Sequence, residues 1–359
     1  MRREHKTPKG LRLLFGLLSS LIAAFLILAA ILVGTAIYLN KAPEPRSGVS
    51  AAGITLDGEG NALITIGEGE SSYAVGRRLE QAGLIRTRHF WNLLSRFEKD
   101  FIKAGTYRIP LPASQTGIRG ALVEGRQILL RVTIPEGVTL KKAAAIMETA
   151  GICSAGDFLS AARDGRIIES YQIPNATMEG YLYPETYFFP AAYPAERVIR
   201  AMADTFMSRV KEIAPESAGM SAGELNNIII LASIVEREYR VADEAPIMAG
   251  VFYNRLRINM PLQSCATVEY LITEIQEKPH PYQLFNIDIE QIHPFNTYVN
   301  GGLPPGPISF PGRTALDAAF HPAQTDYLYF RLVDEAAGRH YFSKSLDAHI
   351  KAGALFVKG

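Results

Sequence analysis

The sequence predicts an α+β protein that follows a single N-terminal membrane helix. Residues 13–40 contain no charged side chain. A strand–turn–helix pattern then occurs twice, starting at residues 64 and 132. Several further helical patterns follow from residue 138, and two strand patterns close the chain at 326–343. Strands and helices mixed in this order indicate an α+β fold.

The apolar segment 13–40 is 28 residues long. About 20 residues suffice to span a bilayer as a helix, and the apolar core of a cleaved signal peptide is shorter, roughly 7–15 residues. The preceding residues 1–12 carry five Lys or Arg and one acidic residue, Glu4. Positively charged flanks stay cytoplasmic. We therefore expect an uncleaved inner-membrane anchor, a cytoplasmic tail 1–12, and a periplasmic location for everything after residue 40.

Charge and cysteine content exclude several protein classes. Lys and Arg number 37 and Asp and Glu 36, so no excess positive charge predicts a nucleic-acid partner. Cys153 and Cys265 are too few for a disulfide scaffold. We expect isolated thiols, with a disulfide in an oxidising compartment as the alternative. No cysteine pair or histidine cluster has metal-ligand spacing, so we predict neither a metal nor a cofactor.

Residues 41–60 are rich in Pro, Gly, Ser and Ala, which predicts a linker. A flexible tether of this length reaches about 25 Å on average. After it, ITIGEGESSYAVGRRLEQAGLI at 64–85 aligns without gaps on VTIPEGVTLKKAAAIMETAGIC at 132–153. Each copy predicts a strand, a turn at Glu-Gly, and a helix that ends at a left-handed glycine, Gly83 or Gly151.

Residues 61–131 also contain an amphipathic helix, TRHFWNLLSRF, and a strand that ends at Pro110. This module has the size and pattern of a LysM-type unit, and such units bind glycans that contain N-acetylglucosamine. A spacer that only sets the distance from the membrane is the alternative. Residues 132–359 form the second predicted domain. It holds helices at about 138–150, 156–164, 194–213 and 222–239, and a 20-residue loop at 293–312 of a length that is usually functional.

The stretch LASIVEREYR, residues 231–240, places two glutamates after an apolar run. Burial of an unpaired carboxylate is unfavourable, and an apolar setting raises the pKa of a carboxylic acid toward neutrality. On a helix, Glu236 shares a face with Ile229, Ala232 and Ser233, whereas Glu238 lies on another face. Helix geometry does not separate the two. Ion pairing of both with Arg237, Arg240 or Arg255 is the structural alternative.

Several separated motifs resemble the YceG-like family of endolytic murein transglycosylases. They are EGYLYPETY, LASIVEREY, VFYNRLRINMPLQSCATVEY, FNTYVNGGLPPGPISFPG and HPAQTDYLYF, in this order. The resemblance extends from the anchor to about residue 350. It departs from the common family pattern at Cys265, where an acidic residue is frequent, at Phe295, where Tyr is frequent, and at Phe310, where Asn is common.

The resemblance implies that Glu236, the first Glu after ASIV, is the catalytic residue. It implies cleavage of nascent peptidoglycan strands between N-acetylmuramic acid and N-acetylglucosamine, which leaves 1,6-anhydro ends and limits strand length. Gln263, Asn296, Thr297 and Tyr298 are the candidate substrate-binding residues. Peptidoglycan strands, the inner membrane and peptidoglycan synthases are the candidate partners.

Two other functions stay open from the sequence. A muramidase would hydrolyse the same bond, and it would ordinarily need a second carboxylate, about 5–5.5 Å away for retention or 6.5–9.5 Å for inversion. A non-catalytic glycan-binding scaffold of the cell-wall synthesis machinery would need only the anchor and the LysM-like module.

Overall fold

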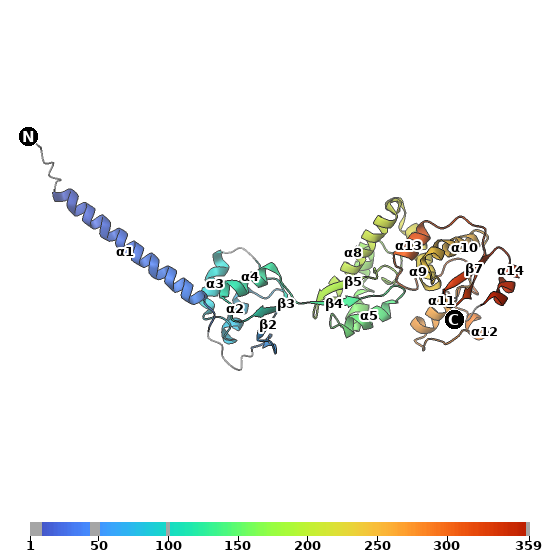
Figure 1. Ribbon diagram of the computed structural model, residues 1–359, viewed down its shortest axis with the longest axis horizontal. Helices are drawn as coiled ribbons and strands as arrows, with labels where there is room; N and C mark the ends of the chain where they lie inside the picture. The colour runs from blue at the N-terminus through green and yellow to red at the C-terminus, as the bar shows by residue number, and fades with distance from the viewer. Residues whose placement is uncertain (1–8, 44–50, 98–100, 357–359) are drawn as a thin grey trace, which may run out of the picture. The chain divides into compact units, whose positions relative to one another are not determined.

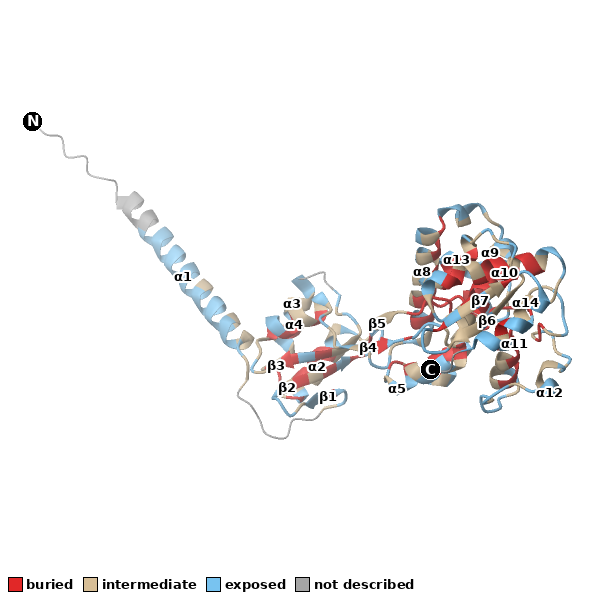
Figure 2. Cartoon of the chain, turned by 45° about the vertical axis from the view of Figure 1, so that its right-hand side comes forward, coloured by how far each residue is buried: buried red, intermediate tan, exposed pale blue. Residues whose placement is uncertain are grey.

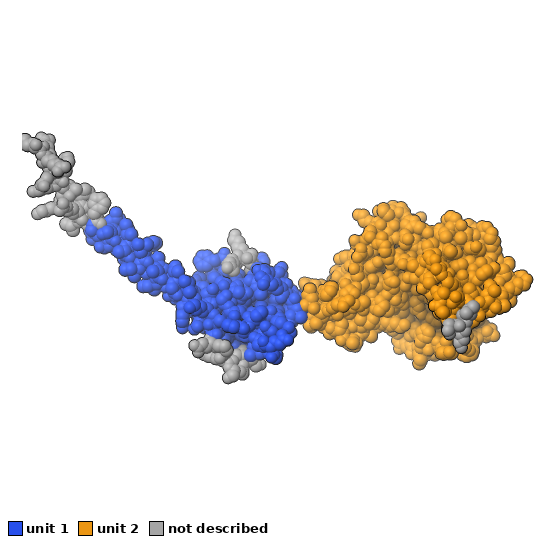
Figure 3. All heavy atoms as spheres, viewed as in Figure 1, with its two compact units in different colours: residues 1–128 blue, residues 129–359 orange. Residues whose placement is uncertain are grey.

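The computed structural model describes residues 9–43, 51–97 and 101–356. The chain divides into two compact units, residues 1–128 and 129–359 (Figure 3). Each unit combines helices with short antiparallel strands (Figure 1). The predicted α+β class is therefore confirmed. The break between the units lies three residues before the expected domain boundary at 131/132.

The first unit begins with a long apolar helix. Within α1, residues 16–40 are apolar and long enough to cross a membrane, and no other helix among the described residues meets this criterion. Its apolar side chains are exposed, as in Figure 2. The elements of this unit are α1 (Lys9–Asn40), β1 (Ile54–Leu56), β2 (Asn61–Ile66), α2 (Ser72–Gln81), α3 (Arg88–Phe97), β3 (Gly105–Pro110) and α4 (Gln115–Glu124).

The three strands of this unit form one antiparallel sheet in the order β1–β2–β3. Trp91 and Tyr107 are fully buried against it. Ile54 in β1 is also buried, although β1 falls within residues 41–60, where the sequence suggested a linker. Residues 44–50 of that linker lie outside the described residues.

The two copies of the internal repeat have the predicted local structure. Ser71 and Thr139 cap the N-termini of α2 and of α5 (Leu140–Thr149) with their side chains. Gly83 and Gly151 follow these helices with φ of 65° and 73°. Leu84 and Ile152 then donate backbone hydrogen bonds of 2.9 and 3.0 Å to the residues five positions earlier. This is the Schellman arrangement, which satisfies carbonyl groups at the helix end.

The second unit contains two short antiparallel pairs, β4–β5 and the hairpin β6–β7, among many helices. Its elements are β4 (Leu129–Thr133), α5 (Leu140–Thr149), α6 (Ala155–Ala161), α7 (Gly165–Ser170), β5 (Thr186–Pro190), α8 (Ala195–Ile213), α9 (Ala222–Glu238), α10 (Ala245–Arg257), α11 (Cys265–Tyr270), the π-helix η3 (Leu271–Ile275), α12 (Asn286–Ile289), α13 (Arg313–Phe320), β6 (Tyr329–Asp334), β7 (Arg339–Ser343) and α14 (Leu346–Lys351), with 3₁₀ turns η1 (Pro215–Gly219), η2 (Ala242–Glu244) and η4 (Ala352–Leu355).

Helix α9 is the core of the second unit. It begins with a capping box between Ser221 and Glu224, which satisfies two free backbone N–H groups. Its residues 229–235 are buried without interruption, and α10 and α13 pack against it. The loop 293–312 contains neither helix nor strand. Two hydrogen bonds hold it to α9. Ile308 N donates to Ser233 Oγ at 3.0 Å, and Ser309 Oγ donates to the backbone carbonyl of Ser233 at 2.9 Å.

Candidate active site

The two glutamates at the C-terminal end of α9 lie in different surroundings. Successive residues of an α-helix are separated by about 100°, so side chains two positions apart point to nearly opposite sides. Both Glu236 and Glu238 are partly buried. The sequence left open which of them faces a ligand site, and the neighbours of each carboxylate now separate them.

Glu236 faces the loop that precedes α13. Its Oε2 accepts a hydrogen bond of 2.8 Å from the backbone N–H of Gly312. Burial raises the pKa of Glu236 to about 7, the Gly312 hydrogen bond opposes this shift, and the Glu136 carboxylate adds to it. A carboxyl group with this pKa holds its proton near neutral pH, as a general acid must.

Glu136 is a neighbour that sequence reasoning missed. It belongs to the turn before α5, and Gly137 N and Val138 O of that turn form backbone hydrogen bonds with Phe310, at 2.9 and 2.8 Å. A Cβ atom added to Gly312 would overlap the Glu136 carboxylate. The Pro-Glu-Gly sequence indicated only a turn. The sequence signal that could have identified this neighbour is the acidic residue in the turn of the second repeat copy.

Glu238 faces the other side, toward the segment before α11. The hydroxyl of Ser264 donates a hydrogen bond to Oε1 of Glu238. Burial raises the pKa of Glu238 to about 7, the Ser264 hydrogen bond lowers it, and nearby Glu269 raises it. Arg237 does not pair with either glutamate of interest, because its guanidinium contacts Glu269 at 2.9 Å. Among the described residues, no ion pair joins Glu236 or Glu238 to Arg237, Arg240 or Arg255, so the structural alternative is not supported.

A pocket of about 520 Å³ opens beside Glu238, within the range of small-ligand sites. Two of the predicted substrate-binding residues, Gln263 and Tyr298, line it together with Cys265. Gln263 has a positive φ of 50° and donates its backbone N–H to Thr297 O at 3.0 Å. Tyr298 Oη lies 3.1 Å from Cys265 Sγ. The structure thus brings these two residues to Glu238.

Asn296 and Thr297 have a different position. Both side chains are buried and neither lines the pocket. Asn296 Nδ2 donates to the carbonyl groups of Ile289 and Gln291, at 2.9 and 2.8 Å. Thr297 Oγ1 accepts from Ser264 N at 3.1 Å. These hydrogen bonds hold the loop that carries Tyr298, so the two side chains position the pocket wall.

The three departures from the common family pattern also have definite places. Phe310 is fully buried, and its backbone pairs with the turn before α5. Phe295 packs between the rings of Tyr270 and His293, with centroid distances of 5.2 and 6.0 Å. Only Cys265 lines the pocket. Burial raises the pKa of the Cys265 thiol, which therefore stays protonated at neutral pH.

Glu179, from the EGYLYPETY motif, is a third carboxyl group with a strongly raised pKa. It is buried, and burial raises its pKa to about 8. Its oxygens accept from Leu140 N at 3.1 Å and from Tyr270 Oη at 3.3 Å. These hydrogen bonds join the start of α5 to the segment around Tyr270.

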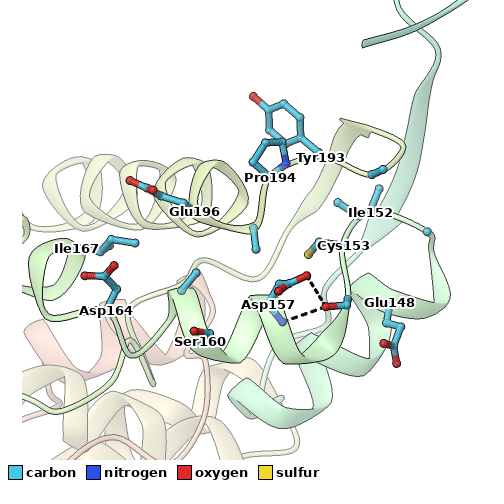
Figure 4. Close-up of a pocket in the computed structure, with 15 residues that line it drawn as sticks. Glu148, Ile152, Cys153, Asp157, Ser160, Asp164, Ile167, Tyr193, Pro194 and Glu196 are labelled. Carbon is cyan, nitrogen blue, oxygen red and sulfur yellow. Dashed lines mark hydrogen bonds between the residues drawn. The ribbon is translucent and has the colours of Figure 1, made fainter. Parts of the chain in front are cut away.

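A second pocket, of about 740 Å³, lies near α6 and the start of α8 (Figure 4). Its lining includes Glu148, Cys153, Asp157, Asp164 and Glu196. Cys153 and Cys265 are both free thiols, and burial raises the pKa of Cys153 to about 11. Within the described ranges, no group of three or more His, Cys, Asp or Glu side chains is placed to hold a metal ion.

Comparison with known proteins agrees with the motifs. Residues 64–354 match the model of the YceG-like family. The chain is 27% identical over 330 residues to an endolytic murein transglycosylase of Streptococcus pneumoniae, which covers 82% of this chain and 59% of that protein. It is 28% identical over 321 residues to a protein of the same name from Bacillus subtilis, with 85% and 87% covered.

A crystal structure of a yceG-like protein from Listeria monocytogenes superposes with a TM-score of 0.55 at 30% identity. It covers 82% of this chain and 99% of that structure. The chain thus spans less than two thirds of the pneumococcal relative and nearly all of the listerial structure. Because the family model matches most of the chain, including both glutamates and the pocket loop, the protein belongs to the YceG-like family.

Proposed function

We propose that this protein is an endolytic murein transglycosylase that cleaves nascent peptidoglycan strands between N-acetylmuramic acid and N-acetylglucosamine. The observation that carries the proposal is Glu236, at the end of a buried helix, whose pKa is raised to about 7 by burial. Membership of the YceG-like family and the names of two relatives support the same reaction.

We assign the acid to Glu236, the residue to which the family motif carries this role. Burial raises the pKa of Glu236 to about 7, and its Oε2 accepts a hydrogen bond from Gly312 N. Glu238 faces the other side of α9 and lines the pocket together with Gln263 and Tyr298. It is the second candidate for the acid, because a general acid must reach the leaving oxygen of a bound sugar.

One carboxyl group is enough for the reaction. In its protonated form it donates the proton to the bridging oxygen as the C1–O bond breaks, and the N-acetylglucosamine side leaves with a free hydroxyl group. The resulting carboxylate then takes the proton of the muramoyl 6-hydroxyl as O6 bonds to C1. The product is a 1,6-anhydro end, no water is consumed, and the acid is regenerated.

Hydrolysis is the second candidate reaction, and a specific observation favours it. If Glu236 is the acid, then Glu136 supplies a second carboxylate next to it. Such a pair is what a hydrolytic muramidase ordinarily uses. The product distinguishes the two reactions, because hydrolysis leaves reducing ends and transglycosylation leaves anhydro ends.

The first unit supports a role in glycan binding. Its β2, α2, α3 and β3 follow one another in the βααβ order, with β2 and β3 paired antiparallel. A pocket of about 780 Å³ lies between the turn after β2 and the residues before β3. We propose that this module is LysM-like and holds the strand. We further propose that α1 anchors the protein in the inner membrane with residues 1–12 cytoplasmic, which confines the enzyme to newly made strands.

The test uses the full chain in detergent micelles and isolated uncrosslinked strands. Mass spectrometry of the products should show 1,6-anhydro ends. Glu236→Gln should lower turnover by about 10²- to 10⁴-fold, the usual contribution of a general acid, while Glu238→Gln keeps most of it. Loss of turnover in both Glu236→Gln and Glu136→Gln, together with reducing ends, would establish the muramidase instead. Absence of turnover in the native protein would leave only the scaffold function.

A further inference from the structure

The C-terminal end of α1 is fastened to the first unit by side chains from the start of α4. Gln115 Nε2 donates to Leu39 O at 2.9 Å. Thr116 N donates to Asn40 Oδ1 at 3.0 Å, and Asn40 Nδ2 donates back to Thr116 Oγ1 at 3.1 Å. These partners are 76 positions apart in the chain. The candidate membrane span therefore ends directly on the first unit.

Arg86 makes a second set of contacts with the same helix end. Its Nε and Nη2 donate to Lys41 O and Ala42 O, at 3.2 and 3.1 Å. Its guanidinium also lies 4.6 Å from the ring centroid of Tyr38, within the range of a cation–π interaction. Positive charge is favourable at the C-terminal end of a helix, and tyrosine is enriched at the level of the lipid head groups. The α1 clasp consists of Arg86, Gln115 and Thr116.

The α1 clasp determines where the first unit lies when α1 spans a bilayer. A free tether made of residues 41–60 would let the unit move about 25 Å from the span on average. Residues 40–42 already contact the unit, so the length of that segment does not set the distance. Because Arg86 is held beside Tyr38, and α3 begins two residues after Arg86, the start of α3 lies next to the head groups.

Helix α3 carries an exposed apolar stripe beside the α1 clasp. The helix packs next to the end of α1 (Figure 1). Leu93 and Phe97 are 47% and 79% exposed, and a spacing of four positions places them on one face of the helix. Trp91 and Ser95 face the interior instead, because the indole N–H and the serine hydroxyl contact Ser72 in α2. The stripe is therefore the outer face of an amphipathic helix.

Basic side chains accompany this stripe. Arg96 is exposed next to Phe97, and Lys41 is exposed at the end of α1. Helices that lie in a membrane interface combine Phe or Leu on one face with Lys or Arg on the polar side. Lys and Arg are also attracted to the anionic lipids of a bilayer surface. The outer face of α3 thus has the composition of a surface that contacts lipid.

We propose that α3 is an interfacial helix. Its outer face, formed by Leu93, Arg96 and Phe97, lies in the head-group layer of the bilayer that α1 spans, and the α1 clasp holds it there. Two observations select a lipid surface as the occupant: the face continues from the end of the candidate span, and it combines apolar side chains with positive charge. The inference rests on the proposed function, because only an anchored α1 brings a bilayer to α3.

Such contact would fix the orientation of the first unit on the membrane. Helix α3 has 10 residues and is about 15 Å long, so lipid contact along it opposes tilting of the unit about the end of α1. Strand β1 lies farther from α1 than α3 does (Figure 2) and would face away from the bilayer. The proposed glycan-binding module would then meet a nascent strand in one orientation, close to the membrane.

Tryptophan fluorescence of the full chain tests the contact. The protein is reconstituted in vesicles of phosphatidylethanolamine and phosphatidylglycerol, with or without bromine atoms near the head-group end of the acyl chains, because bromine quenches tryptophan at short range. The reporter variants are Leu93→Trp and Phe97→Trp, at exposed positions where the fold accepts a larger ring. Trp91 is the single native tryptophan, and its signal in the same vesicles is subtracted.

Matched controls place tryptophan at exposed positions elsewhere. Leu56→Trp lies in β1 of the same unit, and Tyr282→Trp lies in the second unit. Both reporters in α3 should show blue-shifted emission and a loss of intensity in brominated vesicles, because the ring enters the head-group layer. The two controls should show neither change, because their side chains stay in water.

The α1 clasp is tested in the same vesicles. Arg86→Gln, combined with Phe97→Trp, removes the guanidinium group that reaches the end of α1, and it should reduce the loss of intensity. Arg88→Gln is the control, since Arg88 pairs with Glu80 inside the unit at 3.7 Å. Equal quenching of the reporter in these two proteins would overturn the role of the α1 clasp.

Equal emission of the α3 reporters with and without bromine would overturn the inference. A blue shift that appears only when isolated glycan strands are added would also overturn it, by assigning the outer face of α3 to the glycan. Failure of the proposed anchor has a different signature, because alkaline carbonate would then extract the native chain itself from the vesicles. Failure of the proposed reaction would leave the fluorescence result unchanged and would appear only as absence of strand cleavage.

Discussion

Ser264 donates a hydrogen bond from its hydroxyl to Oε1 of Glu238, the carboxyl group that faces the pocket at the end of α9. Two opposite effects meet at this carboxyl group. Burial favours the neutral acid and raises its pKa to about 7, while the Ser264 donor favours the carboxylate and lowers the pKa. The pH range in which Glu238 holds a proton therefore depends on one serine.

Replacing Ser264 with Ala should show which glutamate sets the pH profile of strand cleavage. The acid form of Glu236 is required, so activity should fall as the pH rises above about 7. Loss of the Ser264 donor raises the pKa of Glu238 and should leave the alkaline limb of kcat/KM unshifted. Rates measured from pH 5 to 9 test this, with Ser160→Ala, an exposed serine at the other pocket, as the control. A limb that moves to higher pH by about one unit would assign the acid to Glu238 instead.

Replacing Glu179 with Gln should stabilise the protein at alkaline pH. Burial raises the pKa of Glu179 from 4.5 to about 8, so the folded protein binds this proton more tightly than the unfolded chain. Stability from this group is complete below about pH 4.5 and is lost as the pH rises toward 8. Gln keeps an acceptor for Leu140 N–H and cannot ionise.

The Tm difference between Glu179→Gln and the native protein should therefore grow from pH 5 to pH 9, as measured by calorimetry. Glu212→Gln is the matched control. Its hydrogen bond with Arg313 lowers the pKa of Glu212, so that variant should show no such increase above pH 5. A constant Tm difference for Glu179→Gln across the range would show that Glu179 is not held in the neutral form.

Replacing Gly76 with Ala should destabilise the first unit. Gly76 lies in α2 under the indole ring of Trp91, and an added Cβ would overlap Trp91 Cδ1. Trp91 is fully buried and donates its indole N–H to Ser72 O at 2.9 Å. Overpacking at such a site costs about 1–3 kcal/mol. Trp91 is the single tryptophan of the chain, so its fluorescence reports the unfolding of this unit.

Gly223→Ala provides a control for that substitution, because a Cβ there meets open space at the start of α9. If the first unit holds the strand, Gly76→Ala should also raise KM near the fluorescence midpoint and leave kcat unchanged. Unfolding of the first unit without any change in KM would assign it a spacer role.

Replacing residues 1–40 with a cleavable signal peptide should separate activity from location. The released protein should still cleave isolated strands in vitro, because the residues around Glu236 lie far along the chain from α1. In cells that lack the native protein it should fail to restore normal strand length, which chromatography of released strands measures. Complete restoration would show that the anchor is incidental to function.

Local sequence patterns determined much of this fold. The uncharged run 13–40, the capping box of α9 and the Glu-Gly turns of the repeat depend on interactions between residues a few positions apart. The elements built on these patterns therefore appear within about four residues of their predicted bounds. The helices α4, α7, α10, α11, α12 and α14 were not predicted. Most of them are short, and packing decides the conformation of short segments more than propensity does.

The tertiary structure decided the candidate site. Helix periodicity already implied that Glu236 and Glu238 face different ways, but the side of α9 that borders a pocket depends on α11, the 293–312 loop and the β6–β7 hairpin. Asn296 and Thr297 were expected to touch a sugar, and packing of that loop buries them. Glu136 meets Gly312 across 176 positions of sequence. Sequence periodicity reports local geometry, whereas which distant side chains share a surface is decided only when the loops pack on the core.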